Sequence, residues 1–105
     1  MNFKTHNEDE SINVYGTSLI NCIDVSYTEL KKAFGKPSDD FDNYKSDAEW
    51  LVKFEDGTVA TIYNYKDGKN YMGVNGLPKT KIRNWHVGGN SEKSVELIKK
   101  RLGLN

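Results

Sequence analysis

Residues 48–65, which read AEWLVKFEDGTVATIYNY, predict a β-hairpin from which the rest of the fold can be worked out. Two runs rich in β-branched and aromatic residues flank Asp56 and Gly57, a pair that favours a two-residue type I′ turn because both positions accept a positive φ. Such a loop fixes the register of the two strands. It pairs the residues of one face as Phe54–Val59, Val52–Thr61 and Trp50–Tyr63. Neither face is then wholly polar, so we expect a central hairpin with helices on one side.

Two helices are predicted, one before and one after the hairpin. Ser26 and Glu29 have the spacing of a capping box, which predicts the start of a short helix. Gly35 suits the position just after its end, and Pro37 prevents its continuation. A second helix is predicted over residues 92–102, where apolar residues recur at helical spacing. Extended segments are predicted at residues 12–15, 19–25 and 81–87.

The order of these elements, β-α-β-β-β-α, predicts an α+β fold. The simplest packing is an antiparallel β-sheet of three to five strands with two α-helices packed on one face. Residues 12–105 are expected to form a single domain, and the polar residues 1–11 a flexible N-terminal tail. Either face of the hairpin could receive the helices. The other face would still present apolar side chains and would require a partner, a ligand or a second copy.

The composition bounds the class of protein. The 105 residues contain no run of about 20 apolar residues and no signal-peptide pattern at the start, so we expect a cytoplasmic protein that contacts no membrane. One cysteine, Cys22, excludes an internal disulfide and a cysteine-based zinc cluster. Fifteen Lys and Arg balance fifteen Asp and Glu. Direct binding to nucleic acid is therefore not expected, because phosphate contacts require a basic excess.

Charge is nevertheless segregated along the chain, and the acidic part is the first candidate site. Residues 38–56 hold seven acids against two lysines, whereas residues 66–101 hold nine bases against three acids. A row of carboxylates can imitate a row of phosphates and occupy the basic channel of a nucleic-acid enzyme. An ordinary solvated loop has the same composition. The predicted acidic site for a protein partner consists of Asp39, Asp40, Asp42, Asp47 and Glu49.

The second candidate site lies where the last strand meets the last helix. Backbone N–H groups at a helix start attract phosphate, and adjacent glycines permit a close approach of the ligand. Trp85 could stack on a base, and Arg83 could pair with a phosphate. The alternative is an ordinary turn from strand to helix. The residues of this candidate nucleotide site are Arg83, Trp85, His86, Gly88, Gly89 and Asn90.

Three tyrosines extend this second candidate. Tyr63, Tyr65 and Tyr71 could stack on bases or anchor a protein interface. For Tyr63 we expect instead that it packs across the hairpin against Trp50. For the other two tyrosines we expect an exposed position.

Several stretches of the chain resemble a set of small bacteriophage proteins. They are DAEW (47–50), FEDGTVATIYNYKDG (54–68), NY (70–71) and WHVGG (85–89), and the similarity spans roughly residues 19–99. The resemblance implies an accessory protein of a phage or prophage that acts in the host bacterial cytoplasm. By analogy with proteins of this kind, it implies a counter-defence factor that acts by binding.

Two binding functions follow, and they are kept as alternatives. No nucleophile–base pair and no metal-ligand cluster is visible in the sequence, so we expect no enzyme, no metal and no cofactor. The first function is that of an anti-CRISPR-like inhibitor, which neutralises a bacterial immune effector protein by binding it. The alternative is a sponge that sequesters a cyclic or ADP-ribose-type nucleotide immune signal. The sponge predicts a homodimer or a larger oligomer.

Overall fold

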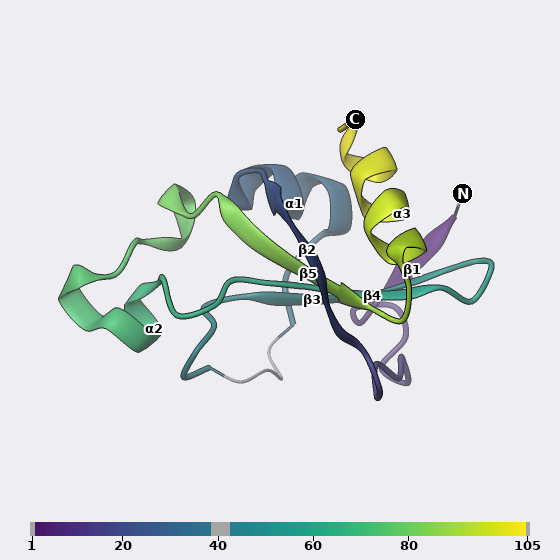
Figure 1. The fold of residues 1–105 in the computed structure, drawn as a ribbon, viewed down its shortest axis with the longest axis horizontal. Coiled ribbons are helices and arrows are strands. Elements are labelled where there is room, and N and C mark those ends of the chain that lie inside the picture. The colour runs from purple at the N-terminus through teal and green to yellow at the C-terminus, as the bar shows by residue number, and fades with distance from the viewer. Residues whose placement is uncertain (1, 39–42, 105) are drawn as a thin grey trace.

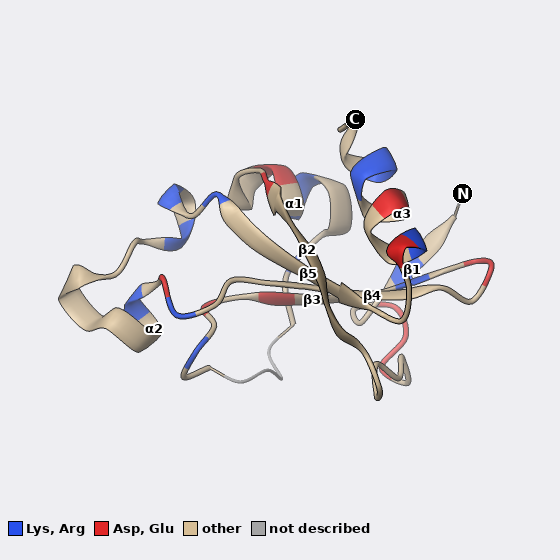
Figure 2. Ribbon diagram, viewed as in Figure 1, with Lys and Arg blue, Asp and Glu red and all other residues tan. Residues whose placement is uncertain are grey.

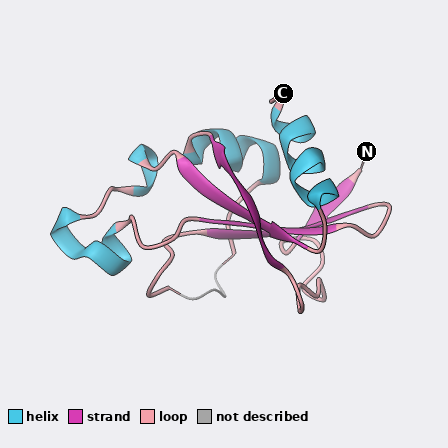
Figure 3. Ribbon diagram, viewed as in Figure 1, coloured by secondary structure: helices cyan, strands magenta, loops and turns pink. Residues whose placement is uncertain are grey.

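A computed structural model describes residues 2–38 and 43–104 of the chain. They form an α+β fold in which five antiparallel strands make one sheet of order β1-β3-β4-β5-β2 (Figure 1). The strands are β1 (Phe3–Thr5), β2 (Ser18–Asp24), β3 (Glu49–Phe54), β4 (Val59–Tyr63) and β5 (Asn84–Gly89). The helices are α1 (Tyr27–Phe34), α2 (Lys69–Met72) and α3 (Glu92–Leu102), with 3₁₀ turns η1 (Gly73–Asn75) and η2 (Lys79–Lys81) (Figure 3).

The class and the antiparallel sheet are as predicted, but the elements differ in three places. Residues 3–5 form a strand, the extended segment predicted at residues 12–15 forms none, and the connection between β4 and β5 contains a short helix, α2. The predicted pair of helices, α1 and α3, lies over the same face of the sheet (Figure 1). The capping box of α1 is present, since Ser26 Oγ accepts from the N–H of Glu29 at 3.0 Å and Glu29 Oε1 accepts from the N–H of Ser26 at 3.2 Å.

The first residues belong to the sheet, where a flexible tail was expected over residues 1–11. β1 pairs with β3, which places Phe3 opposite Phe54. The ring of Phe3 also packs edge-on against Phe34 of α1, with 5.3 Å between centroids. His6 continues the ladder, because its N–H donates to the Leu51 carbonyl at 3.1 Å and its Nδ1 accepts from the Leu51 N–H at 3.3 Å. Backbone pairing with β3 and the contacts of the Phe3 ring together hold this segment on the sheet.

The predicted register of the hairpin is wrong by one residue. Lys53 lies opposite Val59, rather than Phe54 opposite Val59, and the same shift applies along both strands. The N–H of Phe54 donates to the Thr58 carbonyl at 2.8 Å, and Gly57 has φ +91°. The loop therefore has three residues with glycine in the left-handed region, which is the next most common hairpin loop after the two-residue types.

The observed register places the largest apolar side chains of β3, β4 and β5 on one face of the sheet, and the helices cover that face. The buried face carries Trp50, Val52 and Phe54 of β3, Ala60 and Ile62 of β4, and Trp85 and Val87 of β5. Leu30 and Phe34 of α1 and Val95 and Ile98 of α3 pack on it. Burying each of these large side chains contributes about 1.5–3 kcal/mol to the free energy of unfolding. The opposite face carries mostly polar residues, such as Glu49, Lys53 and Thr61, together with the partly exposed Leu51 and Val59.

The long connection between β4 and β5 projects from the sheet. It contains α2, η1 and η2, and it lies at the end of the molecule away from both chain termini (Figure 1). Residues 43–48, which lead into β3, meet it there, since the N–H of Lys66 donates to the Lys45 carbonyl at 2.7 Å.

Candidate functional site

Asn64 is a fully buried amide that ties these two loops together. Its Oδ1 accepts from the backbone N–H groups of Asp47 at 2.7 Å and Ala48 at 3.2 Å. Its Nδ2 donates to Asp47 Oδ1 at 2.9 Å and to Asp67 Oδ1 at 3.0 Å. All of its hydrogen-bonding capacity is therefore used, as a buried amide requires.

The network around Asn64 extends to further residues of the two loops. Ser46 Oγ donates to the Asn64 carbonyl at 2.7 Å, and Asn70 Nδ2 donates to the Ser46 carbonyl at 3.0 Å. A Cβ on Gly68 would lie only 2.0 Å from Asp47 Oδ1, so the close approach of the two loops requires glycine there. We call Ser46, Asp47, Asn64, Asp67 and Asn70 the Asn64 network. Several residues of the stretches 47–50, 54–68 and 70–71 thus have a structural role.

The Asn64 network supports a surface made of residues 43–45 and 65–81, which we call the tyrosine lobe. The rings of Tyr44 and Tyr71 contact each other with 5.2 Å between centroids. The ammonium of Lys66 lies 5.1 Å from the centroid of Tyr65 and 5.3 Å from that of Tyr71, both within cation–π distance. Aromatic rings and a cation thus form one continuous array on the lobe.

The tyrosine lobe gathers most of the exposed apolar surface of the described residues. Eight large hydrophobic side chains are exposed in that part of the chain, and the lobe holds six of them: Tyr44, Tyr65, Tyr71, Met72, Val74 and Leu77. It also holds five lysines and one acid, Asp67, so its formal charge is +4. Figure 2 shows the lysines in blue over this end of the molecule. A concentration of exposed apolar side chains together with charges is typical of an interaction surface.

The uncovered sheet face adjoins the lobe through His86. One row of cross-strand neighbours on this face runs Glu49–Tyr63–His86–Cys22. The His86 ring lies 5.4 Å from Tyr63 and 5.7 Å from Tyr65. Burial lowers the pKa of His86 below its ordinary value, and the Asp67 carboxylate opposes that shift. Burial also raises the pKa of Tyr63, and Glu49 adds to the effect.

The expected contact between Tyr63 and Trp50 is wrong because of the register shift. Trp50 lies opposite Ile62 and points into the core, whereas Tyr63 lies opposite Glu49 on the other face. Tyr65 and Tyr71, by contrast, are exposed.

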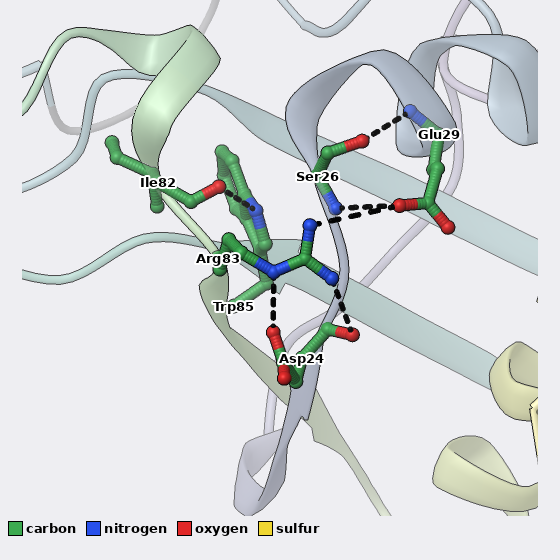
Figure 4. A network of polar contacts seen from close by, with 6 residues as sticks. All are labelled: Asp24, Ser26, Glu29, Ile82, Arg83 and Trp85. Carbon is green, nitrogen blue, oxygen red and sulfur yellow. Dashed lines mark hydrogen bonds and ion pairs between the residues drawn. The ribbon is translucent and has the colours of Figure 1, made fainter.

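The predicted nucleotide site does not assemble around Trp85. This side chain has no exposed surface, and its ring packs edge-on against Trp50 at 5.7 Å and stacks on Tyr27 at 6.3 Å. Its Nε1 donates to the Ile82 carbonyl at 3.2 Å (Figure 4). The indole is a core residue, and no base can stack on it.

Arg83 and the two glycines are also used within the fold. Arg83 Nε pairs with Asp24 Oδ1 at 2.7 Å, and its Nη1 lies 4.0 Å from Glu29 Oε1 (Figure 4). Gly88 and Gly89 lie inside β5, ahead of the turn to α3. A Cβ on Gly88 would lie 2.5 Å from Thr61 Oγ1, and one on Gly89 would lie 2.1 Å from Ser94 Oγ. Close packing, not phosphate binding, requires these glycines; Asn90 follows them and is exposed.

The predicted acidic site is only partly within the described residues. Asp39, Asp40 and Asp42 lie outside them. Asp47 accepts hydrogen bonds on both carboxylate oxygens, from Asn64 on Oδ1 and from the N–H of Asn70 on Oδ2. Glu49 belongs to β3.

Three further observations bear on the class of protein. No family model matches the chain, and no curated protein matches it. In residues 2–38 and 43–104, no group of three His, Cys, Asp or Glu side chains is placed to hold a metal ion. No helix in the same residues is both long and apolar enough to cross a membrane.

Sequence reasoning did not find part of the tyrosine lobe. Tyr44 lies between the first predicted helix and the hairpin, and Lys66, Met72, Val74 and Leu77 lie between the hairpin and the extended segment predicted at residues 81–87. The available signal was the presence of several large apolar residues between glycines, in a segment too polar to be core. The contact between Tyr44 and Tyr71 brings together two segments that the Asn64 network joins, across about 20 residues of sequence.

Proposed function

We propose that this protein is a non-catalytic inhibitor that neutralises a bacterial immune effector protein by binding it, and that the tyrosine lobe is its contact surface. The observation that carries the proposal is the exposed array of Tyr44, Tyr71 and Tyr65 with the Lys66 ammonium between the last two rings. Tyrosine is enriched among the residues that dominate protein–protein binding, because a large rigid ring is buried at little entropic cost.

The contact surface favoured here differs from the acidic site expected from the sequence. Asp47 of that site has both carboxylate oxygens engaged inside the molecule, so it is poorly placed to imitate a phosphate. The tyrosine lobe instead combines exposed apolar area with a positive charge. The choice of an immune effector as target rests on the resemblance of residues 19–99 to bacteriophage proteins.

The nucleotide sponge is less well supported. Its two most important residues are occupied, since Arg83 pairs with Asp24 and Trp85 is buried against Trp50. A sponge would have to bind its ligand through other residues, such as the exposed tyrosines Tyr65 and Tyr71.

The test is a phage-plating assay in bacterial strains that each carry one defence system. Expression of the protein should restore plating in at least one strain, and the tagged protein should retain the effector protein of that system. Tyr65→Ala and Tyr71→Ala should both lose the effect. Tyr15→Ala is the matched control, because Tyr15 is 92% exposed and lies outside the lobe.

Two results would contradict the proposal. If expression of the protein restores plating in none of the strains, the proposed immune target is wrong. If both Tyr65→Ala and Tyr71→Ala keep full activity, the tyrosine lobe is not the contact surface. A heat-denatured sample that releases an intact signal nucleotide would instead support the sponge.

A further inference from the structure

We infer that the tyrosine lobe recognises an acidic protein segment, with Lys66 as its central charge contact; this rests on the proposed function for the assumption that the partner is a protein. Such a partner presents carboxylates to the lysines of the lobe and apolar groups to its rings. Three features of the lobe indicate this: its charge balance, the position of Lys66 and its exposed apolar side chains.

The charge of the lobe is not neutralised within the described part of the chain. Its lysines are Lys45, Lys66, Lys69, Lys79 and Lys81. Among the described residues, the ion pairs join Arg83 to Asp24 and Glu29 and Lys93 to Asp56, and none reaches a lysine of the lobe. The one acid of the lobe, Asp67, accepts a hydrogen bond from Asn64. A partner with carboxylates would therefore meet a complementary field.

Lys66 holds its position at a backbone cost. It is the one residue other than glycine with a positive φ in the described chain, at +61°, a region that side chains with a Cβ adopt unwillingly. Its N–H donates to Lys45 at 2.7 Å, and its ammonium lies against Tyr65 and Tyr71. Among the described residues, no ion pair or hydrogen bond to an oxygen accompanies these two ring contacts of the ammonium. Its N–H donors are therefore available to a carboxylate of a partner.

Exposed apolar side chains of the same lobe indicate a protein partner. Val74 is 93% exposed, and Met72 and Leu77 are also exposed. The helix beneath them, α2, has four residues, too few to form the apolar face by which amphipathic helices lie in a membrane surface. The whole chain has no basic excess, which disfavours nucleic acid. The partner segment should carry carboxylates beside at least one apolar anchor.

The experiment is a titration of the full-length ¹⁵N-labelled protein followed by NMR. The probe is a synthetic peptide in which glutamates alternate with leucine and phenylalanine. Single-stranded DNA and vesicles that contain anionic lipid are titrated separately. We expect the peptide to shift the backbone amides of residues 65–77, with an affinity that falls severalfold between low and physiological salt.

Lys66→Asn separates binding from folding. Asparagine tolerates positive φ better than lysine does, so the thermal midpoint should stay the same or rise, while the peptide affinity falls about tenfold. Lys100→Gln on the exposed face of α3 removes one charge elsewhere and should leave the affinity unchanged.

The inference is overturned if the peptide leaves the lobe amides unshifted, or if Lys66→Asn binds it as well as the native protein. It is also overturned if DNA or vesicles shift the same amides at lower concentration than the peptide. Its failure is distinguishable from that of the proposed function. Peptide binding at the lobe without restored phage plating would contradict only the immune target, whereas restored plating with fully active Lys66→Asn would contradict only the acidic partner.

Discussion

Asn64 and Asp47 hydrogen bond to each other in both directions. The backbone N–H of Asp47 donates to Asn64 Oδ1 at 2.7 Å, and Asn64 Nδ2 donates back to Asp47 Oδ1 at 2.9 Å. The pair joins the segment before β3 to the segment after β4, and the tyrosine lobe is built on it.

Asn64→Ala should therefore be strongly destabilising. It leaves the part-buried N–H group of Asp47 and the buried N–H group of Ala48 without an acceptor, at a cost of about 2–4 kcal/mol in the free energy of unfolding. Urea unfolding measures the change, and Asn90→Ala, at an exposed position, is the matched control with an expected change below about 0.5 kcal/mol. If Asn64→Ala lowers the free energy of unfolding no more than the control does, water accepts the hydrogen bonds of Asp47 and Ala48 in place of Asn64.

Gly88 and Thr61 should be coupled. A Cβ on Gly88 would lie 2.5 Å from Thr61 Oγ1, so Gly88→Ala should lower the free energy of unfolding by about 1–3 kcal/mol. Thr61→Ala removes the colliding oxygen, and the double variant should recover at least half of that loss. A double-mutant cycle gives the coupling free energy. Strictly additive effects would mean that the backbone of β5, rather than Thr61, resists the substitution.

Stability should fall as the pH is lowered through the range in which His86 titrates. Burial lowers its pKa in the folded protein, so below the ordinary value of 6.5 the unfolded chain binds more protons. The contribution of neutral His86 to the free energy of unfolding is fully present above pH 6.5 and is lost as the pH falls below 6.5. Urea unfolding of the native protein and of His86→Gln at pH 7.5 and pH 5.5 isolates it. If the variant loses as much stability on acidification as the native protein, His86 is not the cause.

Lys93 should control the titration of Asp56. A 2.7 Å ion pair with Lys93, followed by the hydrogen bond from the Thr58 N–H, lowers the pKa of Asp56 to about 2. This contribution to stability is present above the ordinary pKa of 3.8 and is lost as the pH falls toward 2. In Lys93→Gln the pKa measured by NMR should rise toward 3.8. An unchanged pKa would assign the shift to the Thr58 hydrogen bond alone.

Local patterns predicted local structure well in this chain. The capping box at Ser26 and Glu29, the helix over residues 92–102 and the two strands of the hairpin all form. The register was missed because Asp-Gly suits both a two-residue turn and a three-residue loop with glycine at its last position. Only the packing of Trp50, Val52 and Phe54 against the helices selects between them.

Non-local contacts account for the rest. Phe3 is a single apolar residue in a polar segment, and only its contacts with Phe34 and Phe54 show that it belongs to the core. Gly88 and Gly89 suggested a phosphate loop, yet their neighbours Thr61 and Ser94 come from other elements. The exposure of Tyr65 and Tyr71 was expected. The position of the Lys66 ammonium close to both rings was not, because Lys66 has a positive φ that its sequence context does not predict.

The position of β5 between β4 and β2 has a consequence for how the chain folds during synthesis. β3 and β4 are neighbours in sequence and can pair as soon as both have been made. β2 must wait for β5, since the partners Cys22 and His86 are separated by more than 60 residues along the chain. A nascent chain that ends before residue 84 therefore carries β2 without its partner, and the sheet can be completed only after nearly the whole chain has left the ribosome.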